Sequence, residues 1–172
     1  MIKLIAGIVI LFGCGYSGIL FSQRFKRRTK QLAELQRVMC ELENSIEFLQ
    51  IPIADALSSV SKNCETELKM TFIYISERLK SDPACDMELV WRRGFEKYRY
   101  SLDLKDEDIE IITDFSKNLG AGNREKEKNN IKATSMRLKL AEDEARAEML
   151  QNTKMYRGLG FLFGIFIVVV LI

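Results

Sequence analysis

The chain has 172 residues, a formal net charge of +2 and no histidine. The absence of histidine removes the commonest general base and the commonest metal ligand, which argues against most acid–base and metal-dependent catalysis. All 24 acidic residues, and every Lys or Arg except Lys3, lie between residues 24 and 157. An uncharged segment therefore stands at each end, and this layout predicts a polar domain attached to a membrane at both ends.

The N-terminal uncharged segment runs from Leu4 to Gln23. About 20 such residues suffice for a helix that crosses a bilayer. A signal peptide and a lipoprotein signal ending at Cys14 are the alternatives, but the apolar run continues past Cys14 to Phe21. A cleaved signal would normally stop being apolar at the cleavage site. We therefore predict a retained transmembrane helix over residues 1–23.

A basic cluster follows this segment directly. Its members are Arg24, Lys26, Arg27, Arg28 and Lys30. Beside an apolar helix, such a cluster typically faces anionic lipid headgroups. No aromatic residues interleave with it as base stacking would require, so we expect no nucleic-acid binding. Because basic flanks stay on the cytoplasmic side, we predict that residues 24–157 form a cytoplasmic domain and that both termini are extracytoplasmic.

The C-terminal uncharged segment, residues 158–172, is shorter. As a helix it rises roughly 22 Å, less than the roughly 30 Å hydrocarbon core. Lys154 and Arg157 flank it and can snorkel toward the headgroups. A buried core helix is the alternative, but Ile165 to Ile172 is apolar at every position and offers no polar face to water. We predict a second transmembrane helix over residues 158–172.

Gly160 and Gly164 lie one turn apart on this predicted span. Small residues at this spacing let two membrane helices approach closely, although the motif also occurs by chance. We therefore place them as candidates for intramembrane packing.

The middle segment shows helical periodicity almost throughout. Pro52 is expected to end a first helix near Gln50 and to lie in the first turn of the next, while Asp82-Pro83 breaks a third helix. Asp103 is the expected N-cap of a fifth helix, and Gly120-Ala121-Gly122 its C-cap. The apolar stripes that support these helices are Leu35, Val38, Met39, Leu42, Ile46 and Leu49; Ile53, Ala56, Leu57 and Val60; Leu68, Phe72, Ile75 and Leu79; Trp91, Phe95 and Tyr98; Ile109, Ile112, Phe115 and Leu119.

A last, unbroken helix is predicted from Arg124 to Arg157, continuing into the C-terminal span. Its seam residues are mostly small and follow a seven-residue (heptad) repeat. They are Ile131, Thr134, Leu138, Ala141 and Ala145. Its expected partner is the helix around Gln31–Leu49, in an antiparallel stalk. The predicted fold is therefore all-α: a bundle of about six helices with a transmembrane helix at each end.

No set of residues indicates catalysis. Glu41, Glu43 and Glu47 lack a nearby base and are interpreted as a solvated face. The acidic residues of 103–108 lack an EF-hand loop pattern, and the glycines of 120–126 lack phosphate-loop spacing. The four cysteines form no C-x-x-C pair and are interpreted as reduced apolar residues. We predict no enzyme activity, no metal and no cofactor.

Several stretches, in their order and spacing, resemble the stage III sporulation protein AB family. They are Lys30-Gln31-Leu32, Leu42-Glu43-x-x-Ile46-x-Phe48, Ile51-Pro52-Ile53-x-x-Ala56-Leu57, Phe115-x-x-x-Leu119-Gly120, Asn123-Arg124 with Lys128 and Ile131, and Gln151-Asn152-x-Lys154-Met155-Tyr156-Arg157-x-Leu159-Gly160. The resemblance covers nearly the whole chain. Two departures are Asn130, where the family often has His, and Ile51, where it usually has Thr.

The resemblance implies a part in endospore formation, in a channel-like complex on the mother-cell side of the membrane that surrounds the forespore. It also implies similarity to the F-type platform proteins of type II secretion and type IV pilus systems, which sit above a cytoplasmic ATPase. The expected partners are the bilayer, other subunits of the complex and the sporulation AA ATPase. Assembly into a homo-oligomer is a further possibility. We expect the helix ends farthest from the membrane to meet the ATPase, with Asp103, Asp106, Glu107 and Asp108 as candidate contacts.

The alternative function is a membrane-anchored helical signalling or regulatory protein. It would require a folded extracytoplasmic sensing region, for which the predicted topology leaves almost no residues.

Overall fold

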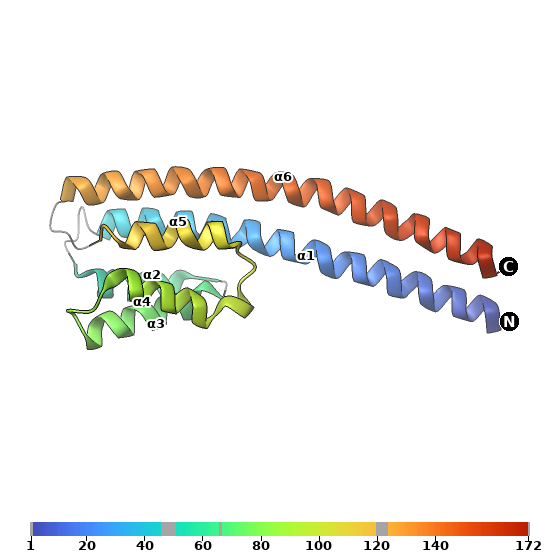
Figure 1. Cartoon of the computed structure of the whole chain (residues 1–172), viewed down its shortest axis with the longest axis horizontal. Coiled ribbons are helices and arrows are strands. Elements are labelled where there is room, and N and C mark those ends of the chain that lie inside the picture. The colour runs from blue at the N-terminus through green and yellow to red at the C-terminus, as the bar shows by residue number, and fades with distance from the viewer. Residues whose placement is uncertain (1, 46–50, 66, 120–123, 172) are drawn as a thin grey trace. The chain divides into compact units, whose positions relative to one another are not determined.

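The computed structural model describes the backbone of residues 2–45, 51–65, 67–119 and 124–171, and the side chains of residues 23–45, 51–65, 67–119, 125–152 and 155. Over this backbone the chain forms six α-helices, one 3-10 helix and no strand (Figure 1). The bounds are α1 Ile2–Asn44, α2 Ile53–Asn63, α3 Leu68–Ser81, α4 Met87–Lys97, η2 Arg99–Ser101, α5 Asp106–Ser116 and α6 Arg124–Leu171. The predicted all-α bundle of about six helices is confirmed.

The chain divides into two compact units, to both of which α1 and α6 contribute. The terminal unit comprises Met1–Thr29 and Glu144–Ile172, and the central unit comprises Lys30–Asp143. The predicted domain boundaries at residues 23 and 158 separate the two membrane spans from the cytoplasmic domain. They stay a prediction.

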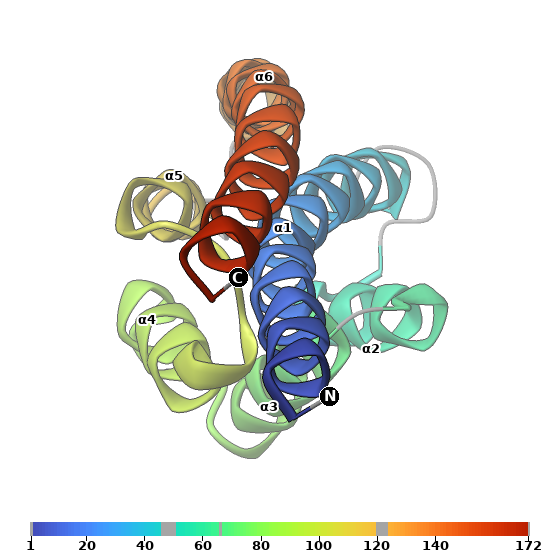
Figure 2. The same ribbon diagram turned by 90° about the vertical axis from the view of Figure 1, so that its right-hand side faces the viewer.

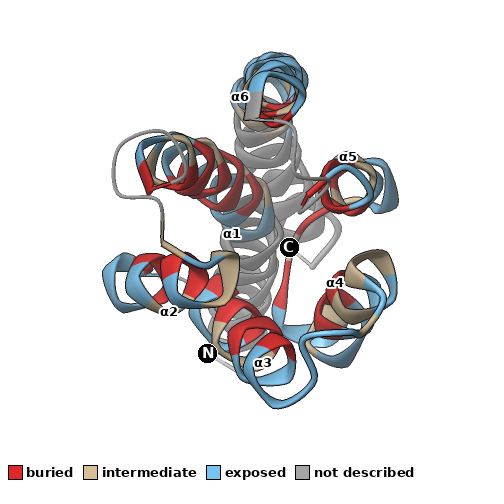
Figure 3. Ribbon diagram, turned by 90° about the vertical axis from the view of Figure 1, so that its left-hand side faces the viewer, coloured by how far each residue is buried: buried red, intermediate tan, exposed pale blue. Residues whose placement is uncertain are grey.

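In the central unit, consecutive helices are neighbours around a ring. The two end-on views show α1, α2, α3, α4 and α5 following one another, with α6 between α5 and α1 (Figures 2 and 3). Successive helices also alternate in direction. Figure 3 shows that their buried surfaces face the inside of the ring. The short connections enforce this arrangement, because they place each helix antiparallel to the previous one.

The central unit has two distinct ends. The junction end holds Lys30 and Gln31 together with the 63–67 and 98–105 connections. There, the Gln31 side chain accepts a hydrogen bond from the Asp103 backbone N–H at 3.0 Å and donates one to Glu67 Oε2 at 3.2 Å. The turn end holds the 82–86 connection and the last turns of α1 and α5. Lys80 of α3 pairs with Asp55 of α2 there at 2.8 Å.

Aromatic rings fill the core among α3, α4 and α5. Phe72 and Trp91 meet edge-to-face at 6.0 Å, and Trp91 meets Phe115 in the same way at 5.8 Å. Phe95 completes the cluster at 6.2 Å from Phe72. All four side chains are buried. Most of the apolar positions predicted on these three helices are therefore buried in the core, whereas Tyr98 and Ile109 are only half-buried. Such aromatic pairs add about 0.5–1.5 kcal/mol each beyond the area they bury.

Gly94 sets how closely α3 and α4 pack. A Cβ at this position would lie 2.7 Å from Ile75 Cγ1, closer than two unbonded carbons can approach. A glycine in a helix interior destabilises it by roughly 0.5–1 kcal/mol relative to alanine. Here that cost accompanies a close approach of two helices in the core.

The predicted pairing of the first and last helices is confirmed within the central unit. The Gln36 amide of α1 donates to Glu142 Oε2 of α6 at 2.8 Å and to the Leu138 carbonyl at 3.5 Å. The seam residues Ile131 and Thr134 are buried, as is Leu138. Small and medium side chains on α6 thus pack toward α1, and a partly buried polar contact fixes their register.

Two helix starts differ from expectation. Pro52 occupies the N-cap of α2 rather than its first turn, and its carbonyl accepts the Asp55 and Ala56 backbone N–H groups. The expected cap of α5 at Asp103 is wrong, because α5 starts at Asp106 with Lys105 at the N-cap position. There the Asp108 carboxylate accepts the Lys105 backbone N–H at 2.8 Å. A carboxylate in a first turn also complements the helix dipole.

Helix α5 ends at Ser116, so Leu119 lies beyond it, although its side chain is buried as predicted. The Asn130 amide of α6 donates to the Phe115 carbonyl at 2.9 Å and so satisfies one acceptor of the last turn. The expected cap at Gly120-Ala121-Gly122 lies outside the described residues, as do Ile46 and Leu49 of the first stripe.

In the terminal unit, α1 and α6 are joined by a partly buried ion pair, in which Arg28 Nη1 lies 2.9 Å from Glu148 Oε2. Ala145 is buried in the same unit. Within the part of the chain that the structure describes, no helix offers a stretch long and apolar enough to cross a membrane. The side chains of the two predicted spans, including Gly160 and Gly164, lie outside the described residues.

Candidate functional site: a charged groove between α4 and α5

An open groove of about 360 Å³ lies along α4 and α5 in the central unit. Charged side chains dominate it. The lining residues are Arg92, Glu96, Arg99, Asp106, Ile109, Glu110, Thr113, Asp114 and Lys117. Three of these are cations and four are carboxylates, so the groove carries one excess negative charge.

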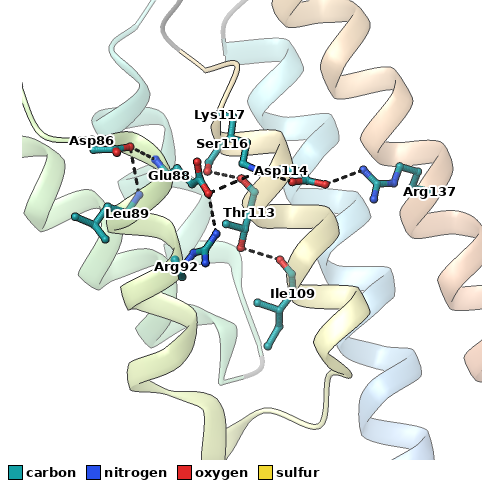
Figure 4. Close-up of polar contacts among 10 residues, drawn as sticks. All are labelled: Asp86, Glu88, Leu89, Arg92, Ile109, Thr113, Asp114, Ser116, Lys117 and Arg137. Atoms are coloured by element: carbon teal, nitrogen blue, oxygen red, sulfur yellow. Dashed lines mark hydrogen bonds and ion pairs between the residues drawn. The ribbon is translucent and has the colours of Figure 1, made fainter.

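Helix α4 is fixed beside the groove by a strong N-cap. The Asp86 carboxylate accepts the backbone N–H groups of Glu88 and Leu89 at 2.9 and 3.4 Å (Figure 4). An Asp at this position is typically worth about 1 kcal/mol of helix stability. This cap places Glu88 in the first turn of α4. From there its carboxylate contacts Arg92 of the same helix and Lys117, which directly follows α5.

A chain of ion pairs ties α4, α5 and α6 together (Figure 4). Glu88 Oε1 lies 2.7 Å from Arg92 and 3.7 Å from Lys117. Lys117 in turn bonds Asp114 Oδ1 at 2.8 Å, and the other oxygen of Asp114 lies 3.6 Å from Arg137. Because these side chains are partly exposed, each pair contributes little alone, and together the pairs link three helices.

The ionisation of Asp114 and Lys117 follows from this contact. The hydrogen bond from Lys117 lowers the pKa of Asp114, and burial opposes that effect only in part. The same hydrogen bond, followed by the Asp114 charge, raises the pKa of Lys117. Both groups are therefore charged at neutral pH.

At the junction end of the groove, Arg99 bonds the Leu104 carbonyl and Asp106 Oδ1, each at 2.7 Å. Glu96 and Glu110 form no ion pair with any described residue. The Thr113 hydroxyl donates to the Ile109 carbonyl at 2.9 Å and so satisfies a backbone acceptor. With its cations already paired and two carboxylates open to solvent, the groove suits a polar contact with another macromolecule.

The four predicted acidic contacts occupy different environments. Asp106 and Glu107 are exposed, Asp103 is partly buried, and Asp108 is only 1 % exposed. Asp108 is held in the cap of α5 and is not available to a partner. Asp103 bonds Gln31, the neighbour of Lys30, at the junction end, and the predicted contact of these acidic residues with the ATPase stays a prediction.

The basic cluster is likewise divided. Arg24, Lys26 and Arg27 are exposed, whereas Arg28 is buried in its pair with Glu148. Lys30 pairs with Glu65 at 3.2 Å in the central unit. The other two predicted flanking residues, Lys154 and Arg157, have side chains outside the described residues.

Two buried polar residues on α1 were not predicted. The Glu34 carboxylate accepts the Glu65 backbone N–H at 2.6 Å and lies 3.0 Å from Arg37. Gln31 is fully buried between the two junction-end connections. No local signal could have revealed them, because their partners lie 31 to 72 residues away.

The described cysteines, Cys40, Cys64 and Cys85, are all free thiols. Burial, then the nearby Glu34 carboxylate, raises the pKa of Cys64 to about 12. A thiol of that pKa stays protonated at neutral pH and is a poor nucleophile. Among the described residues, no group of three or more potential metal ligands comes together.

Comparisons with known proteins agree on one family. The model of the stage III sporulation protein AB family matches residues 3–172. A curated relative, stage III sporulation protein AB of Bacillus subtilis (strain 168), is 25% identical over 173 residues, covering 99% of each chain. A solved structure of stage III sporulation protein AB is similar in fold, with a TM-score of 0.66 and 22% identity, over 72% of this chain and 96% of that one.

Proposed function

This chain belongs to the stage III sporulation protein AB family, and we propose that it is a non-catalytic platform subunit of the secretion-like complex between mother cell and forespore. The family name indicates a role in sporulation, and the platform role is the more specific part that we propose. The observation that carries the proposal is the extent of the family match, which runs from the first uncharged segment through the helical central unit to the last. A platform of this kind needs anchors and a polar docking surface, but no catalytic group.

Membrane attachment is the first part of this proposal. Residues 1–23 and 158–172 cross the mother-cell membrane that surrounds the forespore, and residues 24–157 face the cytoplasm. The test is protease protection in cells stripped of their wall and in inverted vesicles. Cleavage of residues 24–157 only in inverted vesicles is expected. Cleavage only in the wall-less cells would contradict this topology.

The ATPase contact follows from the two ends of the central unit. Since Lys30 enters at the junction end, the turn end is the one farther from the membrane in this topology. We place the sporulation AA ATPase against the turn end, and a neighbouring subunit against the exposed Asp106 and Glu107. Replacing the exposed Asp82 at the turn end by Lys is expected to reduce co-purification of the ATPase. Replacing the exposed Glu107 by Lys is the matched control, and a stronger loss from it would reverse the assignment.

The function itself is tested by deleting the gene in its sporulating host and counting heat-resistant spores. We expect a severe loss that the full chain restores. A chain lacking residues 158–172 should restore few spores, because one anchor is missing. Normal spore numbers after deletion would refute the proposal.

A further inference from the structure

At the junction end of the central unit, where α3 begins and the connection from α4 to α5 lies, two apolar side chains are exposed (Figure 1). Tyr100, in η2, is 104% exposed, and Met70, in the first turn of α3, is 52% exposed. Both lie next to the contact between Tyr74 of α3 and Tyr98, whose rings are 6.4 Å apart. Met70 precedes Tyr74 by one helical turn, and Tyr100 follows Tyr98 by two residues. We call this set the tyrosine–lysine surface: Lys69, Met70, Tyr74, Lys97, Tyr98 and Tyr100.

Lys97 is held over two rings of this surface. Its ammonium nitrogen lies 4.4 Å from the centre of the Tyr74 ring and 5.3 Å from that of Tyr98. These cation–π contacts keep the lysine against the rings while its side chain stays exposed to water. Lys69 is also exposed and forms no ion pair with any residue that the structure describes. The surface therefore presents phenol rings and ammonium groups side by side.

The tyrosine–lysine surface shares the junction end with carboxylates. Glu65 pairs with Lys30 at 3.2 Å, and Glu67 accepts a hydrogen bond from a side-chain amide of α1. Glu96 lines the groove toward α5, and the acidic residues of 103–107 precede or begin α5. The end as a whole thus has mixed charge. Its occupant is selected by the position and composition of the surface, because net charge favours neither sign.

The position of the surface favours a lipid bilayer. The chain enters the central unit at Lys30, and Gln31 accepts the backbone N–H of Asp103 in the connection that carries Tyr100. From Gln23, the end of the predicted span, to Gln31 the continuous helix α1 rises about 12 Å. The headgroup region accounts for roughly 5–8 Å of that distance. Exposed side chains at the junction end therefore need to bridge only the small remainder.

The composition of the surface suits the same occupant. Tyrosine concentrates at membrane–water interfaces because its ring is apolar and its hydroxyl is polar. Lysine can lay its stem along apolar groups while its ammonium reaches the phosphates. Nucleic acid fits poorly, because Lys97 lies over the rings of Tyr74 and Tyr98 on which bases would stack. A protein partner at this end would have to fit into the short distance between the central unit and the bilayer.

We propose that the tyrosine–lysine surface contacts the phospholipid headgroup layer, with Tyr100 and Met70 at the boundary to the acyl chains. Lys69 and Lys97 lie among the phosphates. The inference rests on the membrane attachment proposed above and adds a peripheral contact to the two spans. Such a contact restricts the tilt of the central unit and directs its turn end away from the bilayer.

The test uses the full chain in phospholipid vesicles with one tryptophan as a depth probe. Trp91→Phe removes the native tryptophan, and Tyr100→Trp places one in η2. Lipids brominated on their acyl chains should quench its emission about twofold, since interfacial side chains lie roughly 5–10 Å into the headgroup–acyl boundary. Leu89→Trp, exposed at the turn end of α4, is the matched control and should not be quenched. Circular dichroism checks that both variants remain helical.

Flotation of the vesicles separates this proposal from the attachment on which it rests. A chain that floats with the vesicles while position 100 stays unquenched would overturn the surface contact alone. A chain that does not float would overturn both. In sporulating host cells, p-benzoylphenylalanine in place of Tyr100 should form lipid adducts. An adduct with another protein or with a second copy of this chain in their place would overturn the proposal.

Lys69→Glu tests the lysine contact in the same vesicles. With phosphatidylglycerol present, this change should lower the ratio of docked to undocked chains, followed by quenching at position 100, about fivefold, because a lysine near an anionic surface contributes to binding on that scale. Lys132→Glu, exposed on α6, is the matched control and should leave the ratio unchanged. Equal ratios from the two variants would overturn the assignment of Lys69 to the phosphates.

Discussion

Two regions of the central unit are stabilised in different ways. Among α3, α4 and α5, four buried aromatic rings meet at 5.8–6.5 Å, and a glycine lets α3 and α4 approach each other. Between α1 and α6, side chains are smaller and a partly buried amide–carboxylate contact sets the register. In the first region, the volumes of the packed side chains determine how the helices fit together. In the second region, hydrogen bonds between polar side chains determine it. Substitutions that change volume should therefore damage the aromatic region most, and those that remove a hydrogen bond should damage the α1–α6 pair.

The largest effect is expected from Phe72→Ala. Removing a ring from the aromatic cluster should lower the free energy of unfolding by about 3–5 kcal/mol, because transfer and cavity terms add. The measurement is urea unfolding of the detergent-solubilised full chain, followed by emission of Trp91, the only tryptophan. Tyr100→Ala, at a fully exposed position, is the control and should change stability by less than about 0.5 kcal/mol. Equal effects from the two variants would show that the rings are not packed as described.

Gly94→Ala tests the close approach of α3 and α4. Overpacking against Ile75 should cost about 1–3 kcal/mol, partly offset by up to about 1 kcal/mol of helix propensity. If the clash is the cause, the loss caused by Gly94→Ala should shrink in an Ile75→Ala background, which removes the clashing carbon. A double-mutant cycle measures this coupling. Additive losses would mean that the two residues do not limit each other.

Gln36→Ala tests the polar specification of the α1–α6 pair. Glu142 would lose a hydrogen bond in a buried site, at a cost of about 1–2 kcal/mol. Asn129→Ala, at an exposed position of α6, is the control and should be nearly neutral. A neutral result for Gln36→Ala would assign the register to apolar packing alone.

The smallest effect is expected from the Asp114–Lys117 pair. A lowered pKa of Asp114 means that its contribution is present above the unfolded pKa and is lost as pH falls through the folded one. A raised pKa of Lys117 means that its contribution is present below the unfolded pKa and is lost as pH rises through the folded one. Comparing urea midpoints of the native chain and Asp114→Asn should show a difference at pH 7 that vanishes near pH 2. A constant difference would rule out the ion pair as its source.

The core could be predicted from the sequence because burial follows helical periodicity. Leu68, Phe72, Ile75 and Leu79 recur at spacings of three and four, and all are buried on α3. This pattern lies within one helix, so it can be recognised in the sequence without knowing which helices pack against it. The same holds for the break at Asp82-Pro83, where α3 ends at Ser81.

The caps and buried polar contacts could be predicted only in part. Asp103 and Asp108 are equally suitable acidic residues near the start of α5, and only the fold shows that one caps the helix while the backbone of the other bonds Gln31. Gln31 itself looks like a surface residue, because its partners come from distant connections. The groove depends on how α4 and α5 pack, which neither helix determines alone.

The buried thiol of Cys64 has a practical consequence. Cys64 follows α2 at the junction end, close to the Glu34 carboxylate that also holds the Glu65 backbone. Its modification by a maleimide at neutral pH requires that this corner of the fold open, whereas exposed Cys40 reacts without opening. The ratio of the two labelling rates therefore measures local unfolding at the junction end, and both thiols are native to the chain.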